Sequence, residues 1–440
     1  MNPRFIPILV LLVLVSLAGI FWCSRKPSEK KDAENTDSST VAPAFSISNV
    51  KFYLETSGSM EGYFKGRTEF KDVVNNFVTD LDAQKGRAKI EFFLIDKDIK
   101  PYEASLNDFI KDVAGGNFSM GQSSEIHQMI EKIGKIHKDT EISIFISDCI
   151  LSYSSQEIKK NTEINVQNVE SVLKPYVKAE FSKLQRRGLA VSVYALQSNF
   201  NGKYFNYRNQ VVNCSDCLRP YYVWVIGKSE LLYLFEEKIE KMNFPYKENL
   251  TLGTTPKTVS AHALFPKAGA RNYQINSNKL QNIERISVKA EESIDFFLAL
   301  NLAELPPKYQ DAAFLKQNLR FQTGDKVKVE VVEINPTKEF IETYKNERLK
   351  PRLLEYTHII EVRAYDLLFE QADVKVELEQ PKTQNWVANW HTLNDLDPTQ
   401  ATGKTFALQQ LIDGVKEAYA LSENKPTFLI QTQFSLTKKK

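Results

Sequence analysis

Histidine and cysteine are scarce, and neither is arranged as a metal site. The 440 residues include five histidines and four cysteines. A zinc site would need two more ligands beside the lone motif Cys214-Ser215-Asp216-Cys217, and the histidines are far apart in the sequence. The segment Leu218-Arg219-Pro220 does not continue as the helix that a redox motif requires. We expect a small structural disulfide between Cys214 and Cys217 if the chain is exported, with free thiols as the alternative.

An excess of charge of one sign is also missing. Lysine and arginine number 57 against 55 aspartates and glutamates, a formal net charge of +2. The basic residues are scattered among acids and form no stripe, so we expect no nucleic-acid partner. No internal repeat is visible at any fixed period.

Two short motifs lack the residues that would make them ligand loops. Gly403-Lys404-Thr405 resembles the end of a phosphate-binding loop, but Pro398 stands where that loop needs a glycine. Asn394-Asp395-Leu396-Asp397 is acidic, but it lacks the spacing and the glycine of a calcium loop. We therefore expect a turn at the first motif and a solvated loop at the second.

The sequence contains one long hydrophobic run, Ile6 to Cys23, with Arg4 before it and several basic residues after it. Its 18 residues are just enough to span a bilayer. The alternative is a cleaved signal peptide, with Ser16-Leu17-Ala18 as its small-residue cleavage site. Residues 1–23 are thus predicted to be a signal peptide or a membrane anchor, and residues 6–23 to meet the membrane.

The orientation of the chain at that membrane stays open. The basic residues after the run favour a cytoplasmic position for the rest of the chain. By contrast, the signal-like start and the cysteine usage favour an extracytoplasmic position. We expect a membrane-anchored or exported bacterial protein with an extracytoplasmic, periplasmic body. Residues 24–45 are rich in Ser, Lys, Asp, Glu, Thr and Pro without apolar periodicity, which predicts a flexible linker.

From residue 46 to about 245, buried strands alternate with amphipathic helices. Apolar runs predict strands, and apolar residues at helical spacing predict helices. Such alternation is typical of a doubly wound, mostly parallel sheet with helices on both faces. The predicted strands are 50–54, 90–95, 142–146, 189–196 and 221–226, and the predicted helices are 70–81, 126–133, 169–184 and 231–239.

The pattern changes beyond residue 250. Short β-like segments occur within 275–302 and at 326–334, 357–364 and 374–378, separated by Pro, Asn, Lys and Gly. They predict a β-rich α+β domain over residues 250–440. Near its end we expect a helix at 405–418 and a last strand at 427–434.

The first predicted strand ends in the most informative stretch, Glu55-Thr56-Ser57-Gly58-Ser59-Met60. Open α/β sheets bind ligands at the carboxyl ends of their strands. Glu55, Ser57 and Ser59 alternate, so a tight loop can bring their oxygens together. Such hard oxygen donors suit Mg²⁺, Mn²⁺ or Ca²⁺. The alternative is a helix N-cap, with Ser57 or Ser59 capping the next helix and Gly58 easing the turn.

This stretch resembles the metal-ion-dependent adhesion site of von Willebrand factor type A (vWA) domains. Their first motif is Asp-x-Ser-x-Ser, and Glu55 stands here in place of the leading aspartate. Two further elements follow in the family's order: Ser124-Glu125-Ile126 opens a predicted helix, and Asp148 follows the strand Ile144-Phe145-Ile146-Ser147. The resemblance covers residues 46–245 only. Ser124 stands where the family usually has threonine, and Ser123 is an alternative to it.

The resemblance implies a divalent cation, tentatively Mg²⁺, with Glu55, Ser57, Ser59, Ser124 and Asp148 around it. Ser57 and Ser59 would coordinate the cation directly, and Ser124 would contribute when the site is engaged by a partner. Glu55 and Asp148 would hold the cation mainly through water. An acidic side chain of a protein partner would fill the open position, so the implied function is protein binding without catalysis. Because glutamate is longer than aspartate and Mg²⁺ tolerates poor geometry badly, a degenerate, metal-free scaffold is one alternative.

The other alternative is a metal-assisted hydrolase that uses Asp148 and Ser57. His127, on the helix after Ser124, could serve as a base for a serine nucleophile. A surface or core role for this histidine is the simpler interpretation. Nothing in the sequence demands an enzyme.

Overall fold

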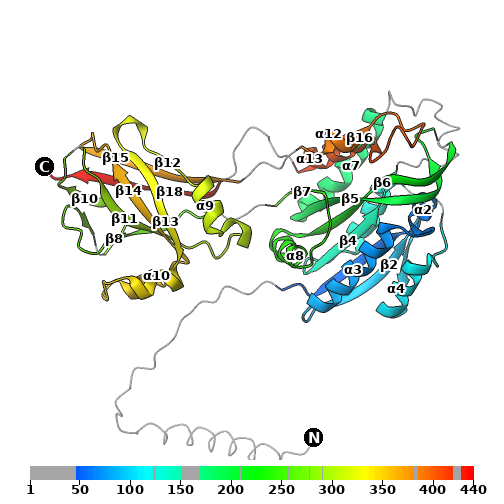
Figure 1. The fold of residues 1–440 in the computed structure, drawn as a ribbon, viewed down its shortest axis with the longest axis horizontal. Helices are drawn as coiled ribbons and strands as arrows, with labels where there is room; N and C mark the ends of the chain where they lie inside the picture. Colours follow the sequence, from blue (N-terminus) through cyan, green and yellow to red (C-terminus); the bar gives the residue numbers. More distant parts are fainter. Residues whose placement is uncertain are drawn as a thin grey trace, which may run out of the picture. The chain divides into compact units, whose positions relative to one another are not determined.

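The computed structural model describes residues 46–121, 125–150, 169–208, 210–254, 258–276, 278–289, 291–380, 385–419 and 428–440. The predicted anchor at 1–23 and linker at 24–45 lie outside these ranges. Among the described residues, no helix is long and apolar enough to cross a membrane. The described chain forms an α/β part and a β-rich part, which we treat separately (Figure 1).

A seven-stranded mixed sheet forms the centre of the α/β part, in the order β3-β2-β1-β4-β6-β5-β7. β1 is parallel to both β2 and β4, and the other neighbouring pairs are antiparallel. Four strands (β1, β2, β4 and β5) therefore run in one direction. The strands are β1 (Asn49–Glu55), β2 (Lys89–Ile95), β3 (Ile99–Tyr102), β4 (Glu141–Ser147), β5 (Leu189–Phe205), β6 (Val211–Lys228) and β7 (Glu248–Leu252).

Helices cover both faces of this sheet, as the alternation of strands and helices predicts. Phe52 and Leu54 of β1 pack in one hydrophobic cluster with α3, α4 and α8, whereas Tyr53 packs in a second cluster with α5 and α7. Successive residues of a strand point to opposite faces, so both faces of β1 are buried. The helices are α2 (Glu61–Phe64), α3 (Glu69–Gln84), α4 (Leu106–Gly115), α5 (Ile126–Ile136), α7 (Val169–Arg186) and α8 (Ser229–Lys241).

The longest departure from the predicted elements is the hairpin of β5 and β6. The sequence pattern predicts strands only at 189–196 and 221–226, yet the two strands pair from Leu189 and Lys228 out to Phe205 and Val211. A short connection makes antiparallel pairing the only choice, because a parallel pair needs a crossover of a dozen or more residues. Cys214 and Cys217 form the predicted disulfide, across a register shift in this ribbon.

The β-rich part consists mainly of two sheets that share one hydrophobic cluster. The five-stranded sheet has the order β12-β15-β18-β10-β9, and the four-stranded sheet has the order β13-β14-β11-β8. The elements are β8 (His262–Pro266), β9 (Gln274–Ile275), β10 (Ile283–Ile286), β11 (Ile294–Leu300), α9 (Ala312–Asn318), β12 (Arg320–Gln322), β13 (Lys328–Pro336), α10 (Thr337–Thr343), α11 (Lys350–Leu353), β14 (His358–Tyr365), β15 (Gln371–Glu379) and β18 (Phe428–Lys438). This confirms that the region after residue 250 is β-rich.

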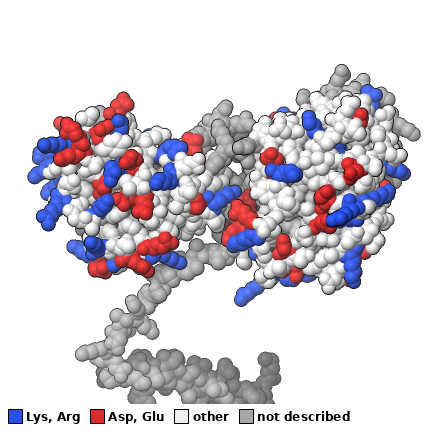
Figure 2. Space-filling view, viewed as in Figure 1, with Lys and Arg blue, Asp and Glu red and all other residues white. Residues whose placement is uncertain are grey.

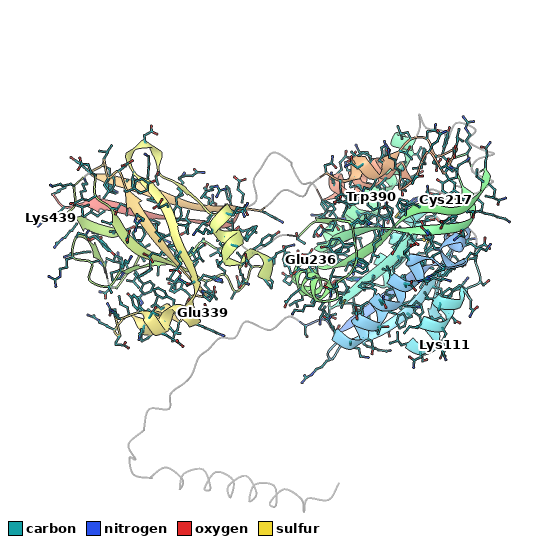
Figure 3. All side chains as sticks on the ribbon, in the orientation of Figure 1. Lys111, Cys217, Glu236, Glu339, Trp390 and Lys439 are labelled. Atoms are coloured by element: carbon teal, nitrogen blue, oxygen red, sulfur yellow. A yellow bond between two sulfur atoms is a disulfide. The ribbon has the colours of Figure 1, made fainter. Side chains whose placement is uncertain are left out.

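One segment of the region after residue 250 packs on the α/β part and not in the β-rich part. Residues 385–419, here called the strap, contain α12 (Val387–Trp390), β16 (His391–Thr392), β17 (Thr405–Phe406) and α13 (Leu408–Ala418). The strap lies on the α/β part, beside α7 and the β5–β6 ribbon (Figure 1), and its apolar side chains join the cluster that contains α5 and α7. Figure 3 labels Trp390 and Cys217 on these two segments, and the Trp390 ring lies 6.4 Å from that of Tyr222. The chain then returns to the β-rich part, where β18 pairs with β15 and β10.

Charged side chains are mixed over the surface. On the face shown in Figure 2, lysine and arginine are interspersed with aspartate and glutamate over both parts. Many of them are close pairs, such as Lys267 with Glu361 at 2.5 Å and Lys174 with Glu417 at 2.5 Å. Exposed ion pairs contribute little to stability, so we expect apolar packing to hold the strap on the α/β part.

Gly414 provides a test of that packing. A Cβ at this position would lie 2.8 Å from the Lys174 carbonyl oxygen and 3.0 Å from the Val177 Cβ of α7. Alanine is a better helix former than glycine by about 1 kcal/mol, but overpacking a close contact costs roughly 1–3 kcal/mol. We expect Gly414→Ala to lower the free energy of unfolding by about 1 kcal/mol in urea titrations. Lys416→Ala on the same helix is the control and should change it by less than about 0.5 kcal/mol. A Gly414→Ala variant as stable as the wild type would show that α13 does not pack this closely on α7.

Candidate functional site

The candidate site is built by the adjacent parallel strands β1 and β4. Their register pairs Leu54 with Ile146, which brings the carboxyl ends of both strands to the same edge of the sheet. Glu55 is the last residue of β1, and Asp148 follows the last residue of β4. The predicted convergence of these two carboxyl groups therefore follows directly from strand pairing.

The loop after β1 carries both serines to the same place. It turns at once into a short 3₁₀ helix, Gly58–Met60, which leads into α2. The Ser57 and Ser59 hydroxyl oxygens are 2.9 Å apart, and the Ser59 hydroxyl donates to Asp148 Oδ1 at 3.2 Å. Ser57 precedes the 3₁₀ helix, but its side chain makes no capping hydrogen bond. The N-cap alternative is therefore wrong for Ser57.

The segment ending at Gly121 closes one side of this loop. Ser57 and Gly121 form an isolated parallel β-bridge, and the Gly121 amide donates to the Thr56 carbonyl at 2.8 Å. A Cβ on Gly121 would lie 2.0 Å from Asp96 Oδ2, so only glycine allows this approach. Ser123 and Ser124 follow after Gln122 and lie outside the described residues. The predicted role of Ser124 stays a prediction.

The four described candidates are buried. The exposed fractions are 3% for Glu55, 0% for Ser57, 6% for Ser59 and 2% for Asp148. Burial, and after it the charge of the nearby Asp148, raise the pKa of Glu55 to about 8, against hydrogen bonds from Ser147 and Ser57. Burial likewise raises the pKa of Asp148 to about 6, against hydrogen bonds from the Ile150 amide and Ser59 and the charge of Arg219. Two like charges so close and so buried oppose each other's ionisation.

One oxygen of each carboxyl group has no hydrogen-bond partner among the described residues. These atoms are Glu55 Oε2 and Asp148 Oδ2, and both are fully buried. A buried acceptor without a partner costs about 1–3 kcal/mol, and more if it is charged. Two hydroxyls and two carboxyl oxygens are the hard donors that Mg²⁺, Mn²⁺ and Ca²⁺ prefer. The residues present therefore fit a hard divalent cation, which would satisfy the buried oxygens.

Histidine and cysteine take no part in this donor set. Within the described residues, no group of three or more His, Cys, Asp or Glu side chains is placed to hold a metal ion. The candidate site has only two carboxyl groups and relies on hydroxyls. His127 instead stacks on Tyr176, with ring centroids 5.0 Å apart, and its Nδ1 lies 3.1 Å from the Glu125 carboxylate.

A buried cluster that the sequence pattern does not predict lies beside the candidate site. Arg219 is 2% exposed, and its guanidinium lies over the Tyr204 ring, 4.1 Å from the centroid. The Tyr204 hydroxyl donates to Asp395 Oδ2, and the Tyr207 amide donates to Asp395 Oδ1 at 2.9 Å. The predicted solvated loop at 394–397 is wrong for Asp395, which is 2% exposed. A single arginine before an apolar run, or a single aspartate in a polar stretch, carries no sequence signal of such burial.

The carboxyl pair makes stability depend on pH. Glu55 has a pKa in the folded state above its ordinary value, so the folded state binds a proton that the unfolded state releases. Binding of this proton stabilises the folded state fully at pH values below the ordinary carboxyl pKa. The stabilisation is lost as pH rises through about 8. We expect the metal-free protein to lose stability between about pH 5 and pH 9 in urea titrations with a chelator.

Glu55→Gln should flatten this decline, because the amide does not ionise, and should stabilise the protein most at high pH. The matched control is Glu61→Gln, which changes a half-buried acid at the start of α2 and should leave the decline unchanged. Parallel pH profiles of the wild type and Glu55→Gln would contradict the assignment.

No protein-family model matches the chain, and no characterised protein matches its sequence. We therefore infer the function from the geometry of the strand ends.

Proposed function

We propose that the chain is a vWA-like protein that binds a protein partner through a divalent cation held at the ends of β1 and β4. The observation that carries this proposal is the convergence of Glu55, Ser57, Ser59 and Asp148, with one buried oxygen on each carboxyl group lacking a partner among the described residues. The order and spacing of these residues resemble the adhesion site of the family. The proposal adds Ser124 from the same motif.

The roles of the chain's residues follow from their chemistry. Ser57 and Ser59 would hold the cation with their hydroxyl oxygens, and Glu55 and Asp148 would supply the negative charge around it. The cation, when bound, offers a coordination position to an acidic side chain of the partner. No bond is broken in such binding, so we propose no enzymatic activity. The membrane or exported location, with residues 6–23 as anchor or signal, is part of the same proposal.

Burial limits how a partner reaches this site. The four described candidates expose at most 6% of their surface, so a partner carboxylate reaches the cation only if neighbouring loops open. This burial is also the observation that favours the second candidate function, a metal-free scaffold. In that case the carboxyl pair stays largely protonated, and another surface of the molecule makes the contacts.

Metal binding distinguishes the two candidates. We expect Mg²⁺ and Mn²⁺ to bind the protein with a dissociation constant near or below about 1 mM, the weak end of the range for protein sites with hard oxygen ligands. Calorimetry would measure it, and a rise in unfolding temperature would confirm that the folded state is the one that binds. The variant Ser57→Ala/Asp148→Ala removes two donors and should lose both signals.

The control for this measurement is Ser105→Ala/Asp139→Ala. Ser105 is an exposed cap of α4, and Asp139 is an exposed partner of Lys228 at 3.3 Å. The control should bind metal as the wild type does. A well-folded wild type with no metal-dependent signal would contradict the adhesion-site proposal and favour the metal-free scaffold.

A further inference from the structure

A buried positive charge lies beside the candidate site. Arg219 is 2% exposed, and its Nη1 has no hydrogen-bond partner among the described residues. A buried charge is costly unless it is paired. The face of the Tyr204 ring offers partial compensation at 4.1 Å, since an aromatic face attracts a cation. The full compensation must come from anions nearby.

The backbone places those anions at the same end of the sheet. β6 runs antiparallel to β4 and pairs Tyr222 with Ser147, the residue before Asp148. The Pro220 carbonyl, next to Arg219, accepts a hydrogen bond of 2.5 Å from Tyr63. Tyr63 belongs to α2, which directly follows the loop of Ser57 and Ser59. Arg219 therefore lies at the same end of the sheet as Asp148, near the helix that follows the serine loop.

The strap supplies the other anion. Asp395 accepts hydrogen bonds from the Tyr204 hydroxyl and the Tyr207 amide, so it fixes the ring over which the guanidinium lies. Burial lowers the pKa of Arg219, but Tyr204, Tyr63, Asp148 and Asp395 outweigh it, and the pKa is raised.

We propose that Arg219 is a built-in counter-ion of the candidate site, held in place by Tyr204 and Asp395. It stabilises the Asp148 carboxylate when no divalent cation is present. By occupying the same electrostatic position, it weakens the binding of such a cation. The second half of this inference rests on the proposed metal-binding function, and the first half does not.

The first test is a double-mutant cycle in the metal-free protein. Arg219→Met and Asp148→Asn are made singly and together, and unfolding equilibrium constants are measured in urea with a chelator. If the two charges stabilise each other, the double variant is more stable than the sum of the single effects predicts, by at least about threefold in the unfolding constant. The matched cycle of Arg219→Met with Asp139→Asn, an exposed acid paired with Lys228, should show no coupling. Additive effects in both cycles overturn the inference.

A milder variant keeps the test valid if Arg219→Met does not fold. Asp395→Asn keeps the Oδ1 acceptor for the Tyr207 amide and places an amide NH2 donor beside the Tyr204 hydroxyl oxygen. It removes a charge that competes with Asp148 for Arg219. The cycle of Asp395→Asn with Asp148→Asn should therefore show coupling of the opposite sign to the Arg219 cycle, because two like charges share one cation. Additivity here again overturns the inference.

The second test measures Mn²⁺ binding by calorimetry. Removing one nearby positive charge in a partly desolvated site should tighten binding by about tenfold, so Arg219→Met should bind Mn²⁺ more tightly than the wild type. Equal or weaker binding by a folded variant overturns the metal half of the inference. If no variant binds Mn²⁺ while the Arg219–Asp148 coupling is present, the proposed function fails and the counter-ion stands.

Discussion

The parallel pairing of β1 with β4 is the constraint on which the rest of the site depends. It places two carboxyl groups, Glu55 and Asp148, at one edge of the sheet and under cover. Their mutual repulsion and their loss of water both favour the protonated forms. Whatever neutralises this pair decides what the site does. The candidates are protons, a divalent cation and the guanidinium of Arg219. Two protons or one divalent cation cancel both negative charges, whereas the guanidinium cancels one.

The strap is the second structural element that reaches this edge. It supplies hydrophobic cover for the sheet face that carries α5 and α7, and it supplies Asp395 to the buried cluster. Tyr222, which pairs with Ser147 at the end of β4, also donates a hydrogen bond of 2.9 Å to Thr405 of the strap. A segment more than 150 residues further along the chain thus takes part in both the core and the electrostatics of the α/β part. Because β18 then pairs with β15, the α/β part and the β-rich part are each completed only after the chain has passed through the other.

The sequence pattern predicted the elements that are buried by their own composition. The apolar runs at β1, β2 and β4 and the apolar spacing in α3, α5 and α8 agree with the structure. No helix was predicted at α4, although Leu106, Phe109, Ile110 and Val113 have helical spacing and pack in one hydrophobic cluster. It predicted a helix at 405–418, which the structure largely confirms as α13, but periodicity says only that one face is apolar. Which sheet that face covers is a long-range property, and local spacing does not encode it.

For the site, strand ends were predictable and burial was not. A short apolar run followed by an acid places that acid at the carboxyl edge of a sheet, and this rule locates Glu55 and Asp148. Arg219 stands just before an apolar strand run and Asp395 in a polar stretch, and neither position indicates burial by itself. The packing of the ribbon and the strap covers them.

Glu55 shows both cases, because its place at a strand end was predictable from the sequence and its burial was not. Its extra methylene, compared with the aspartate of the family motif, lengthens the reach of a carboxyl group whose Oε2 has no partner among the described residues. Ser147 and Ser57 hydrogen-bond this side chain, so it lies over the end of β4 rather than out in the loop. A carboxyl group held there lies close to Asp148, and the two groups oppose each other's ionisation. A nearby positive charge relieves this repulsion, and the guanidinium of Arg219 provides such a charge within the fold.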